Sequence, residues 1–255
     1  MPETLTVLGG GGWFPAHERQ TACALLRNGS AAVMIDAGTG LGRLSEHPEL
    51  LAGVERLDIL LTHFHLDHIV GLAYIPAIGV CEETCVWGPG ERLYGSPTAV
   101  MLERFTHEPY HPVPFEAQQI QVRDLPEGEL ELAGVRITHR VQPRHSAPTL
   151  GLRFGDVLAW ITDTAYDPET AAFARGCALL AHECWWPSTR PRNPDIHSSA
   201  TQAAQVARDA EAERLLLIHL PPFQESLRPL LVEAQATLPD TQLGVDHSEL
   251  SMQPA

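Results

Sequence analysis

The sequence predicts an α/β fold in which two β-sheets pack face to face and helices cover their outer faces. Three observations lead to this prediction. Blocks of short strand patterns are interleaved with helix patterns along the chain. The run at residues 57–61 is almost wholly apolar, as expected for a strand that is buried on both faces. The 255 residues are 44% apolar and 19% charged, a composition that supports a sizeable core.

The first third of the chain predicts strands followed by a helix and a buried strand. Residues 4–8 form a short apolar strand that ends at the run Gly9-Gly10-Gly11-Gly12. Asn28-Gly29 predicts the turn of a β-hairpin. The elements after residue 20 are the hairpin strands 21–27 and 31–36, a helix at 41–51 and the buried strand 57–61.

The rest of the chain continues this alternation. Apolar runs with turn residues between them predict strands at 80–87, 130–132, 135–141, 150–154, 157–162, 178–182 and 215–218. Helical periodicity predicts helices at 98–105, 168–175, 198–211 and 224–238. The two proline-rich loops are too short to be linkers, so we expect a single domain over residues 1–255.

Composition excludes several classes of protein. The chain has 17 basic and 32 acidic residues, giving a net charge of −15, and every basic residue is an arginine. A Schiff-base lysine and a phosphate-loop lysine are therefore excluded, and a broad basic face for nucleic acid is disfavoured. We find no membrane-spanning run and no secretory leader, so we expect a cytoplasmic protein without a membrane partner.

The five cysteines are scattered along the chain and do not have the spacing of a disulfide framework. We expect small buried thiols in a reducing compartment. Cys81 and Cys85 could share a metal, but no second Cys/His pair follows at the spacing of a zinc finger.

The strongest chemical signal is the segment Thr62-His63-Phe64-His65-Leu66-Asp67-His68, which follows the buried strand. In an extended segment His63 and His65 point to the same side. A helix that begins near Ile69 would bring Asp67 and His68 to the same pocket. Three imidazoles and a carboxylate packed this closely are the usual ligands of a divalent metal.

Three further polar residues follow predicted strands in the same way, namely His145, Asp163 and His219. Each alone would be an ordinary residue at the end of a strand. Together with the histidine segment they supply five histidines and two aspartates, which suffice for two metals with one bridging carboxylate.

This pattern resembles the metallo-β-lactamase superfamily, and the resemblance covers nearly the whole chain. It implies a four-layer αββα sandwich and two Zn²⁺ per chain, with Mn²⁺ as the alternative. His63, His65 and His145 would hold one metal, Asp67, His68 and His219 the other, and Asp163 would bridge them. Asp36 resembles the aspartate that supports the metal loop from below.

Two later segments are similar to the ribonuclease Z group of this superfamily. They are His182-Glu183-Cys184 and His197-Ser198-Ser199-Ala200. The resemblance implies that Glu183 and His197 form a pair that protonates the leaving group. Arg190 and Arg192, in the loop after Glu183, could bind phosphate because guanidinium offers a bidentate fork.

The chain lacks room for the basic arm that grips tRNA in this group, since only 18 positions separate His145 from Asp163. We therefore expect a homodimeric phosphodiesterase that acts on a small or cyclic phosphodiester or on an RNA 3′ end. A hydroxide held by the two metals would be the nucleophile, with Asp67 orienting it. The alternatives are an acyl hydrolase (a lactonase, thioesterase or β-lactamase-like enzyme) and a binding module without catalysis. The acyl hydrolases do not call for a Glu183–His197 pair.

Overall fold

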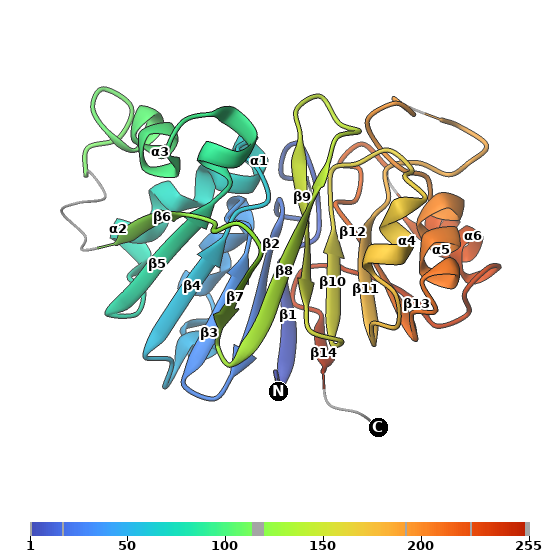
Figure 1. Cartoon of the computed structure of the whole chain (residues 1–255), viewed down its shortest axis with the longest axis horizontal. Coiled ribbons are helices and arrows are strands. Elements are labelled where there is room, and N and C mark those ends of the chain that lie inside the picture. Colours follow the sequence, from blue (N-terminus) through green and yellow to red (C-terminus); the bar gives the residue numbers. More distant parts are fainter. Residues whose placement is uncertain (1, 17, 114–119, 192, 225, 253–255) are drawn as a thin grey trace.

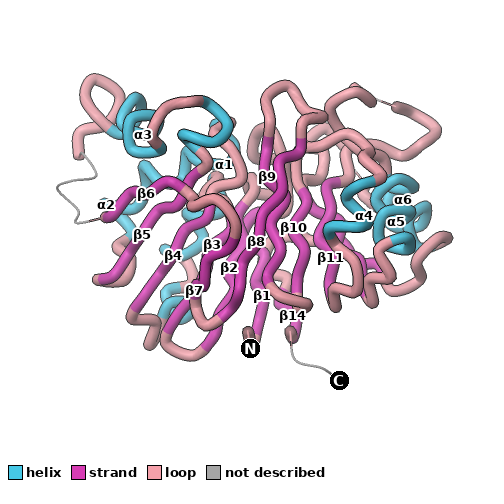
Figure 2. Tube along the Cα trace, viewed as in Figure 1, coloured by secondary structure: helices cyan, strands magenta, loops and turns pink. Residues whose placement is uncertain are grey.

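The computed structural model describes residues 2–16, 18–113, 120–191, 193–224 and 226–252. Within these residues, two seven-stranded β-sheets pack against each other, and helices lie on the outer face of each sheet (Figures 1 and 2). The predicted four-layer αββα sandwich is confirmed.

The first sheet combines an antiparallel part with a parallel part. In spatial order its strands are β14 (Glu249–Ser251), β1 (Thr4–Gly9), β2 (Cys23–Asn28), β3 (Ala31–Ile35), β4 (Arg56–Leu60), β5 (Glu83–Gly88) and β6 (Gln121–Asp124). Strands β2 and β3 form the expected hairpin, in which Asn28 pairs with Ala31 and Gly29 adopts a φ of 60°. Strands β3 to β6 are parallel to one another.

The second sheet has the same division. In spatial order its strands are β13 (Thr241–Leu243), β12 (Arg214–Ile218), β11 (Leu179–Glu183), β10 (Leu158–Ile161), β9 (Thr149–Phe154), β8 (Val135–Gln142) and β7 (Glu129–Leu132). Strands β10 to β13 are parallel, and β7 to β10 are antiparallel. Strands β6, β13 and β14 were not predicted, because they are short and carry few apolar side chains.

The helices divide between the two outer faces. Those on the first sheet are α1 (Leu66–Ile69), α2 (Ile75–Ile78) and α3 (Thr98–Thr106), with 3₁₀ helices at Thr39–Ser45, Pro48–Leu51 and Val70–Tyr74. Those on the second are α4 (Glu169–Phe173), α5 (Ala200–Asp209) and α6 (Arg228–Gln235). A π-helix at Gly90–Tyr94 follows β5, and its Leu93 packs against the core between the sheets. The helix expected at residues 41–51 is instead two 3₁₀ segments, because Pro48 interrupts it.

The main core lies between the two sheets. Apolar side chains of both inner faces, such as Val33, Leu60, Leu152 and Trp160, pack there in one buried cluster. Each outer face adds a smaller cluster under its helices.

Truncation of this core should be costly. Phe154 on β9 is completely buried in the cluster between the sheets. Phe154→Ala is expected to lower the free energy of unfolding by about 3–5 kcal/mol, because it removes apolar contacts and leaves a cavity. Denaturant unfolding of Phe154→Ala and of Tyr110→Ala, whose side chain is 77% exposed, measures the difference. Equal losses in the two variants would contradict this packing.

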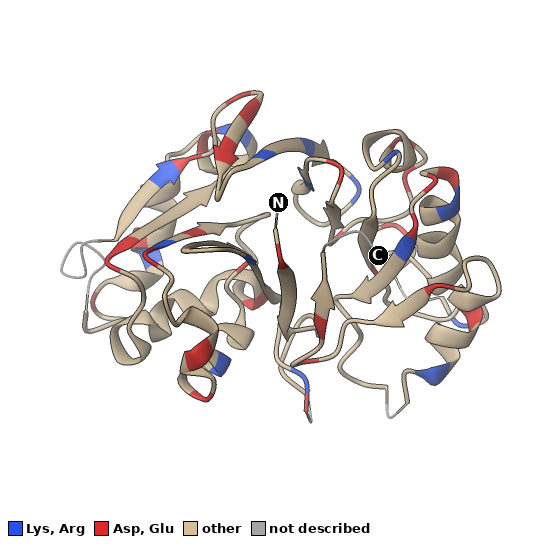
Figure 3. Ribbon diagram, turned by 90° about the horizontal axis from the view of Figure 1, so that it is seen from below, with Lys and Arg blue, Asp and Glu red and all other residues tan. Residues whose placement is uncertain are grey.

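In the part of the chain that the structure describes, no helix has the length and apolar character needed to cross a membrane. Figure 3 shows arginines interspersed with acidic residues over both halves of the molecule, without a broad basic face in that view.

The parallel strands determine where the site lies. The carboxyl ends of parallel strands in an α/β sheet are where ligand-binding residues gather. Here β4 leads directly into the histidine segment, while β10 and β12 lead to Asp163 and His219. The two sheets thus bring these residues to one edge of the sandwich, the upper edge near α1 in Figure 1.

Candidate metal centre and active site

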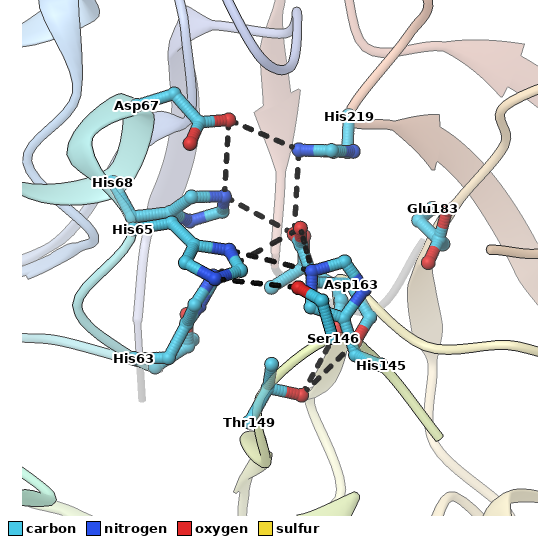
Figure 4. Close-up of polar contacts among 12 residues, drawn as sticks. His63, His65, Asp67, His68, His145, Ser146, Thr149, Asp163, Glu183 and His219 are labelled. Carbon is cyan, nitrogen blue, oxygen red and sulfur yellow. Dashed lines mark hydrogen bonds and ion pairs between the residues drawn. The ribbon is translucent and has the colours of Figure 1, made fainter. Parts of the chain in front are cut away.

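The polar residues predicted at the strand ends come together in two groups (Figure 4). Within each group the ligand atoms lie within 4.8 Å of one another. The first group consists of His63, His65, His145 and Asp163, and the second of Asp67, His68 and His219.

The Asp163 carboxylate lies between the two groups. Its Oδ2 is 3.9 Å from His63 Nε2 and 3.4 Å from His145 Nε2. Its Oδ1 is 3.1 Å from His68 Nε2 and 3.3 Å from His219 Nε2. One oxygen therefore faces each group, which is the arrangement that a bridging ligand requires.

The second group is held together by Asp67 as well. Asp67 Oδ2 is 3.6 Å from His68 Nε2 and 3.4 Å from His219 Nε2. Ligand atoms about 2.1 Å from one tetrahedral ion would lie about 3.4 Å apart. The spacing of these donors fits a divalent cation.

Unpaired ring nitrogens support the same interpretation. His63 Nε2 and His68 Nε2 are buried and have no hydrogen-bond partner, although both face the Asp163 carboxylate. Burial, together with the neighbouring His68, lowers the pKa of His63 well below its ordinary value. His63 is therefore neutral at physiological pH, the form in which imidazole binds a metal.

Hydrogen bonds on the side away from the cluster fix the ring orientations of His68 and His145. Asp36 accepts hydrogen bonds from the backbone N–H of Thr62 at 2.8 Å and from its hydroxyl at 3.0 Å. Asp36 Oδ2 also lies 2.8 Å from His68 Nδ1, which leaves His68 Nε2 facing the cluster. The prediction that Asp36 supports the histidine segment from below is confirmed. His145 Nδ1 in turn donates to the carbonyl of Ile196 at 2.8 Å.

Removing this support should weaken metal binding. Asp36→Asn is expected to lower metal affinity by about 10- to 100-fold, because Asn pairs poorly with both Thr62 and His68. Competition with a chromophoric chelator measures the affinity. Asp58→Asn is the matched control, since Asp58 is buried in the adjacent strand β4 but pairs with Arg56 and Trp87. A similar loss of affinity in both variants would contradict the role of Asp36.

Three residues of the site adopt a left-handed backbone conformation. The φ angles are 57° for Asp36, 50° for Asp163 and 49° for His219. Asp36 and His219 directly follow strands β3 and β12, and Asp163 lies two residues after the end of β10. Such conformations are costly for residues other than glycine and tend to occur at functional sites. They turn the chain sharply as it leaves the sheet, so the side chain is directed into the site.

The predicted Glu183–His197 pair is also formed. Glu183 ends strand β11, is completely buried, and lies with Oε2 2.9 Å from His197 Nδ1. The backbone N–H of Thr164 donates to Glu183 Oε1. Burial opposes protonation of His197, but the Glu183 carboxylate outweighs it and raises the pKa of His197 above its ordinary value. A ring nitrogen of His197 lies within 4.8 Å of a carboxylate oxygen of Asp163 and of a ring nitrogen of His219, so the pair borders the cluster.

A cavity of about 920 Å³ opens over both groups. It is lined by Trp13, His65, Leu66, Asp67, His145, Ser146, Asp163, Trp185, Pro191, Asn193, Ile196, His197, His219 and Phe223. None of these described lining residues is an arginine. The charged and titratable groups of the described part of the wall are those of the two clusters and His197.

The described arginines near the site in sequence do not line this cavity. Arg190 lines a neighbouring cavity of about 590 Å³, which shares only Phe223 with the first. Arg192 lies outside the described residues. Arg140 is paired with Asp167 and Glu169, and Arg144 donates to the carbonyl of Tyr166.

The cysteines take no part in the site. All five are free, and only Cys81 is partly exposed. Among the described residues, the candidate metal groups contain no cysteine. The expectation of small buried thiols is confirmed for the four cysteines other than Cys81.

Sequence reasoning missed three aromatic residues of the cavity wall in their observed roles. Trp185 is 3% exposed and stacks on His197 with ring centroids 4.6 Å apart. Phe223 follows the two prolines after His219 and contacts Trp185 edge-on. Trp13 lies just after the glycine run, whose function is close approach: a Cβ at Gly12 would be 2.3 Å from His219 Nε2. The glycine run Gly9–Gly12 was the sequence signal that could have located this part of the cavity wall, because glycines allow chain segments to approach closely.

Comparison with known proteins agrees with this geometry. A family model described as "Beta-lactamase superfamily domain" matches residues 32–220. Ribonuclease Z of Clostridium tetani is 26% identical, and the match covers 97% of this chain and 98% of that protein. The probable metallo-hydrolase YhfI of Bacillus subtilis is 25% identical, with 86% and 87% covered.

Solved structures share the fold. The metallo-beta-lactamase fold protein YhfI from Bacillus subtilis superposes with a TM-score of 0.79 at 21% identity, over 98% of this chain and 100% of that one. Human tRNase Z, short form, gives a TM-score of 0.71 at 20% identity, with the same shares covered. A diphosphatase from the PhnP family gives 0.70 at 20% identity, over 97% and 96%.

Proposed function

Because this chain belongs to the beta-lactamase superfamily, whose family model matches residues 32–220, we propose that it is a metal-dependent phosphodiesterase of the ribonuclease Z type. A metallo-hydrolase related to ribonuclease Z agrees with the relatives and structures described above. Phosphodiester specificity is supported by the Glu183–His197 pair, which lies beside Asp163 and the two groups of candidate metal ligands.

We assign the metal ligands by the two groups of donors. His63, His65 and His145 would hold one divalent cation, and Asp67, His68 and His219 the other. Asp163 would bridge them, since it presents one oxygen to each group. Two such cations, zinc or alternatively manganese, would polarise a phosphoryl oxygen and make water a stronger nucleophile at neutral pH. Asp67, which borders the cavity, would orient that water.

His197 supplies the proton that the leaving oxygen needs. Its Nδ1–H is held by the buried Glu183 carboxylate, which also favours the charged form of the ring. The charged ring carries a second proton at Nε2, which it can donate. Trp185 stacks on the ring at an interplanar angle of 20° and holds it in the cavity wall. An alkoxide leaving group is a strong base, so this donation lowers the barrier to its departure.

The cavity favours a small phosphodiester over an RNA chain. Binding to an RNA backbone depends on several positive contacts, and the part of the lining that the structure describes includes no arginine. A cavity of about 920 Å³ has the size of a small-molecule site. Arg190, in the neighbouring cavity, would meet only a substrate that extends past Phe223.

Hydrolysis of bis(p-nitrophenyl) phosphate tests the proposed activity. The protein fully loaded with zinc, and separately with manganese, is expected to release p-nitrophenol. The absence of release with either metal, in samples shown by elemental analysis to hold two ions per chain, would refute the phosphodiesterase assignment. Faster hydrolysis of a lactone or thioester in the same samples would favour the acyl hydrolase.

A further inference from the structure

We propose that Trp13 and Phe223 form an apolar stacking subsite, which binds a flat aromatic ring of the substrate and so selects a nucleoside phosphodiester. This inference rests on the proposed function and specifies its substrate class. It concerns the part of the substrate that does not react.

Trp13 is held in a costly position. Its backbone has a φ of 67°, and its side chain is 66% exposed although tryptophan is among the most apolar residues. Its backbone N–H donates to Asp67 Oδ2 at 2.6 Å. The site residue Asp67 therefore fixes the tryptophan beside the cavity, where its ring contacts Phe14 at a centroid separation of 5.5 Å and remains largely exposed. Strain of this kind is retained where it serves binding.

Phe223 lines the same cavity from another segment. Its side chain is 39% exposed, and its ring lies 5.7 Å from that of Trp185 in an edge-on contact. The preceding prolines, Pro221 and Pro222, restrict the chain between this ring and His219. The backbone carbonyl of Pro221 also accepts a hydrogen bond from Arg19, which ties this segment to the N-terminal loop after Trp13.

The charges on the cavity wall indicate which kind of group the rings of Trp13 and Phe223 bind. The two groups of candidate metal ligands would bind one phosphate, and among the residues that the structure describes no arginine lines the cavity to bind a second. The large exposed hydrophobic side chains of the wall are Trp13, Leu66 and Phe223. An uncharged planar ring stacks on such side chains and contributes about 1–3 kcal/mol per base in single-stranded nucleic-acid sites, equivalent to roughly 5- to 150-fold in affinity. A nucleobase has this chemistry.

Binding measurements without turnover test the subsite. Calorimetry of the metal-loaded full chain compares adenosine 5′-monophosphate with ribose 5-phosphate, two phosphomonoesters that differ only in the base. The nucleotide is expected to bind at least about tenfold more tightly. Trp13→Ala and Trp13→Leu should remove that advantage and leave the affinity for ribose 5-phosphate unchanged. Trp13→Phe should retain most of it, because a flat ring remains.

Tyr110→Ala is the matched control, since Tyr110 is an exposed aromatic residue that does not line the cavity. It should change neither affinity. Equal affinity for the two probes in the wild type, including no measurable binding of either, would overturn the subsite. So would a loss of both affinities in Trp13→Leu, or sedimentation showing that Trp13→Ala converts a dimer into a monomer, because the ring would then serve a second copy of the chain. A failure of the proposed function is seen separately, as the absence of phosphodiester hydrolysis.

Discussion

Asp163→Asn is expected to lower kcat for bis(p-nitrophenyl) phosphate by about 10³-fold or more and to reduce the bound metal from two ions per chain to one or fewer. Asp163 is the residue that faces both groups of ligands, with oxygen-to-nitrogen separations of 3.1–3.9 Å. Asparagine keeps the shape but offers one neutral oxygen in place of two charged ones. Metal ions contribute several kcal/mol to such reactions, and each 1.36 kcal/mol is a tenfold change in rate.

Asp167→Asn is the matched control for this substitution. Asp167 lies four residues further on and is also mostly buried, but it pairs with Arg140 outside the cluster. Elemental analysis and steady-state kinetics on both variants give the comparison. If Asp163→Asn keeps two ions and more than about a tenth of the activity, the bridging role is wrong.

His197→Ala is expected to lower kcat by about 10²- to 10⁴-fold on substrates with poor leaving groups while metal content stays at two ions per chain. The reason is that His197 is bonded to Glu183, whereas the two main groups of ligands are complete without it. The loss should grow along a series of aryl phosphodiesters as the leaving phenol becomes less acidic. A p-nitrophenolate ion needs little protonation, so that ester should be affected least.

This dependence on the leaving group separates proton donation from a structural role. Glu183→Gln should show the same trend in weaker form, since it leaves the ring in place but removes the charge that favours its protonated form. His139→Ala controls for loss of a buried histidine, because His139 bonds to the carbonyl of Pro126 outside the cavity. A loss that is uniform along the series would contradict proton donation, and an unchanged rate on a lactone would favour acyl chemistry.

Much of this architecture follows from local sequence patterns. The buried strand β4 and the hairpin of β2 and β3 have strong apolar and turn signals, and both were predicted. Strand β6, with the sequence Gln-Val-Arg-Asp, has no such signal, because its place in the sheet depends on pairing with β5. The 3₁₀ helices likewise depend on packing against the first sheet.

The site was predicted well where spacing determines it and less well where it depends on tertiary structure. His63 and His65 share a side because of strand geometry, and Asp163 and His219 were found because each follows an apolar strand. The left-handed conformations at Asp36, Asp163 and His219 leave no mark on sequence patterns. Trp13 was missed because only folding brings its backbone N–H to Asp67 Oδ2, at 2.6 Å, and so places the residue beside the cavity. The position of Arg190 in a separate cavity also depends on the tertiary structure and could not be predicted from the sequence.

We propose that side chains distant in the sequence assemble around two cations, and that the resulting site hydrolyses phosphodiesters. The most direct measurement is elemental analysis of wild-type protein purified without chelator, with turnover of bis(p-nitrophenyl) phosphate recorded on the same sample as metal is titrated in. We expect two divalent ions per chain and activity that rises with occupancy. Fewer than one ion per chain after titration, or full occupancy without any phosphodiester hydrolysis, would contradict this proposal.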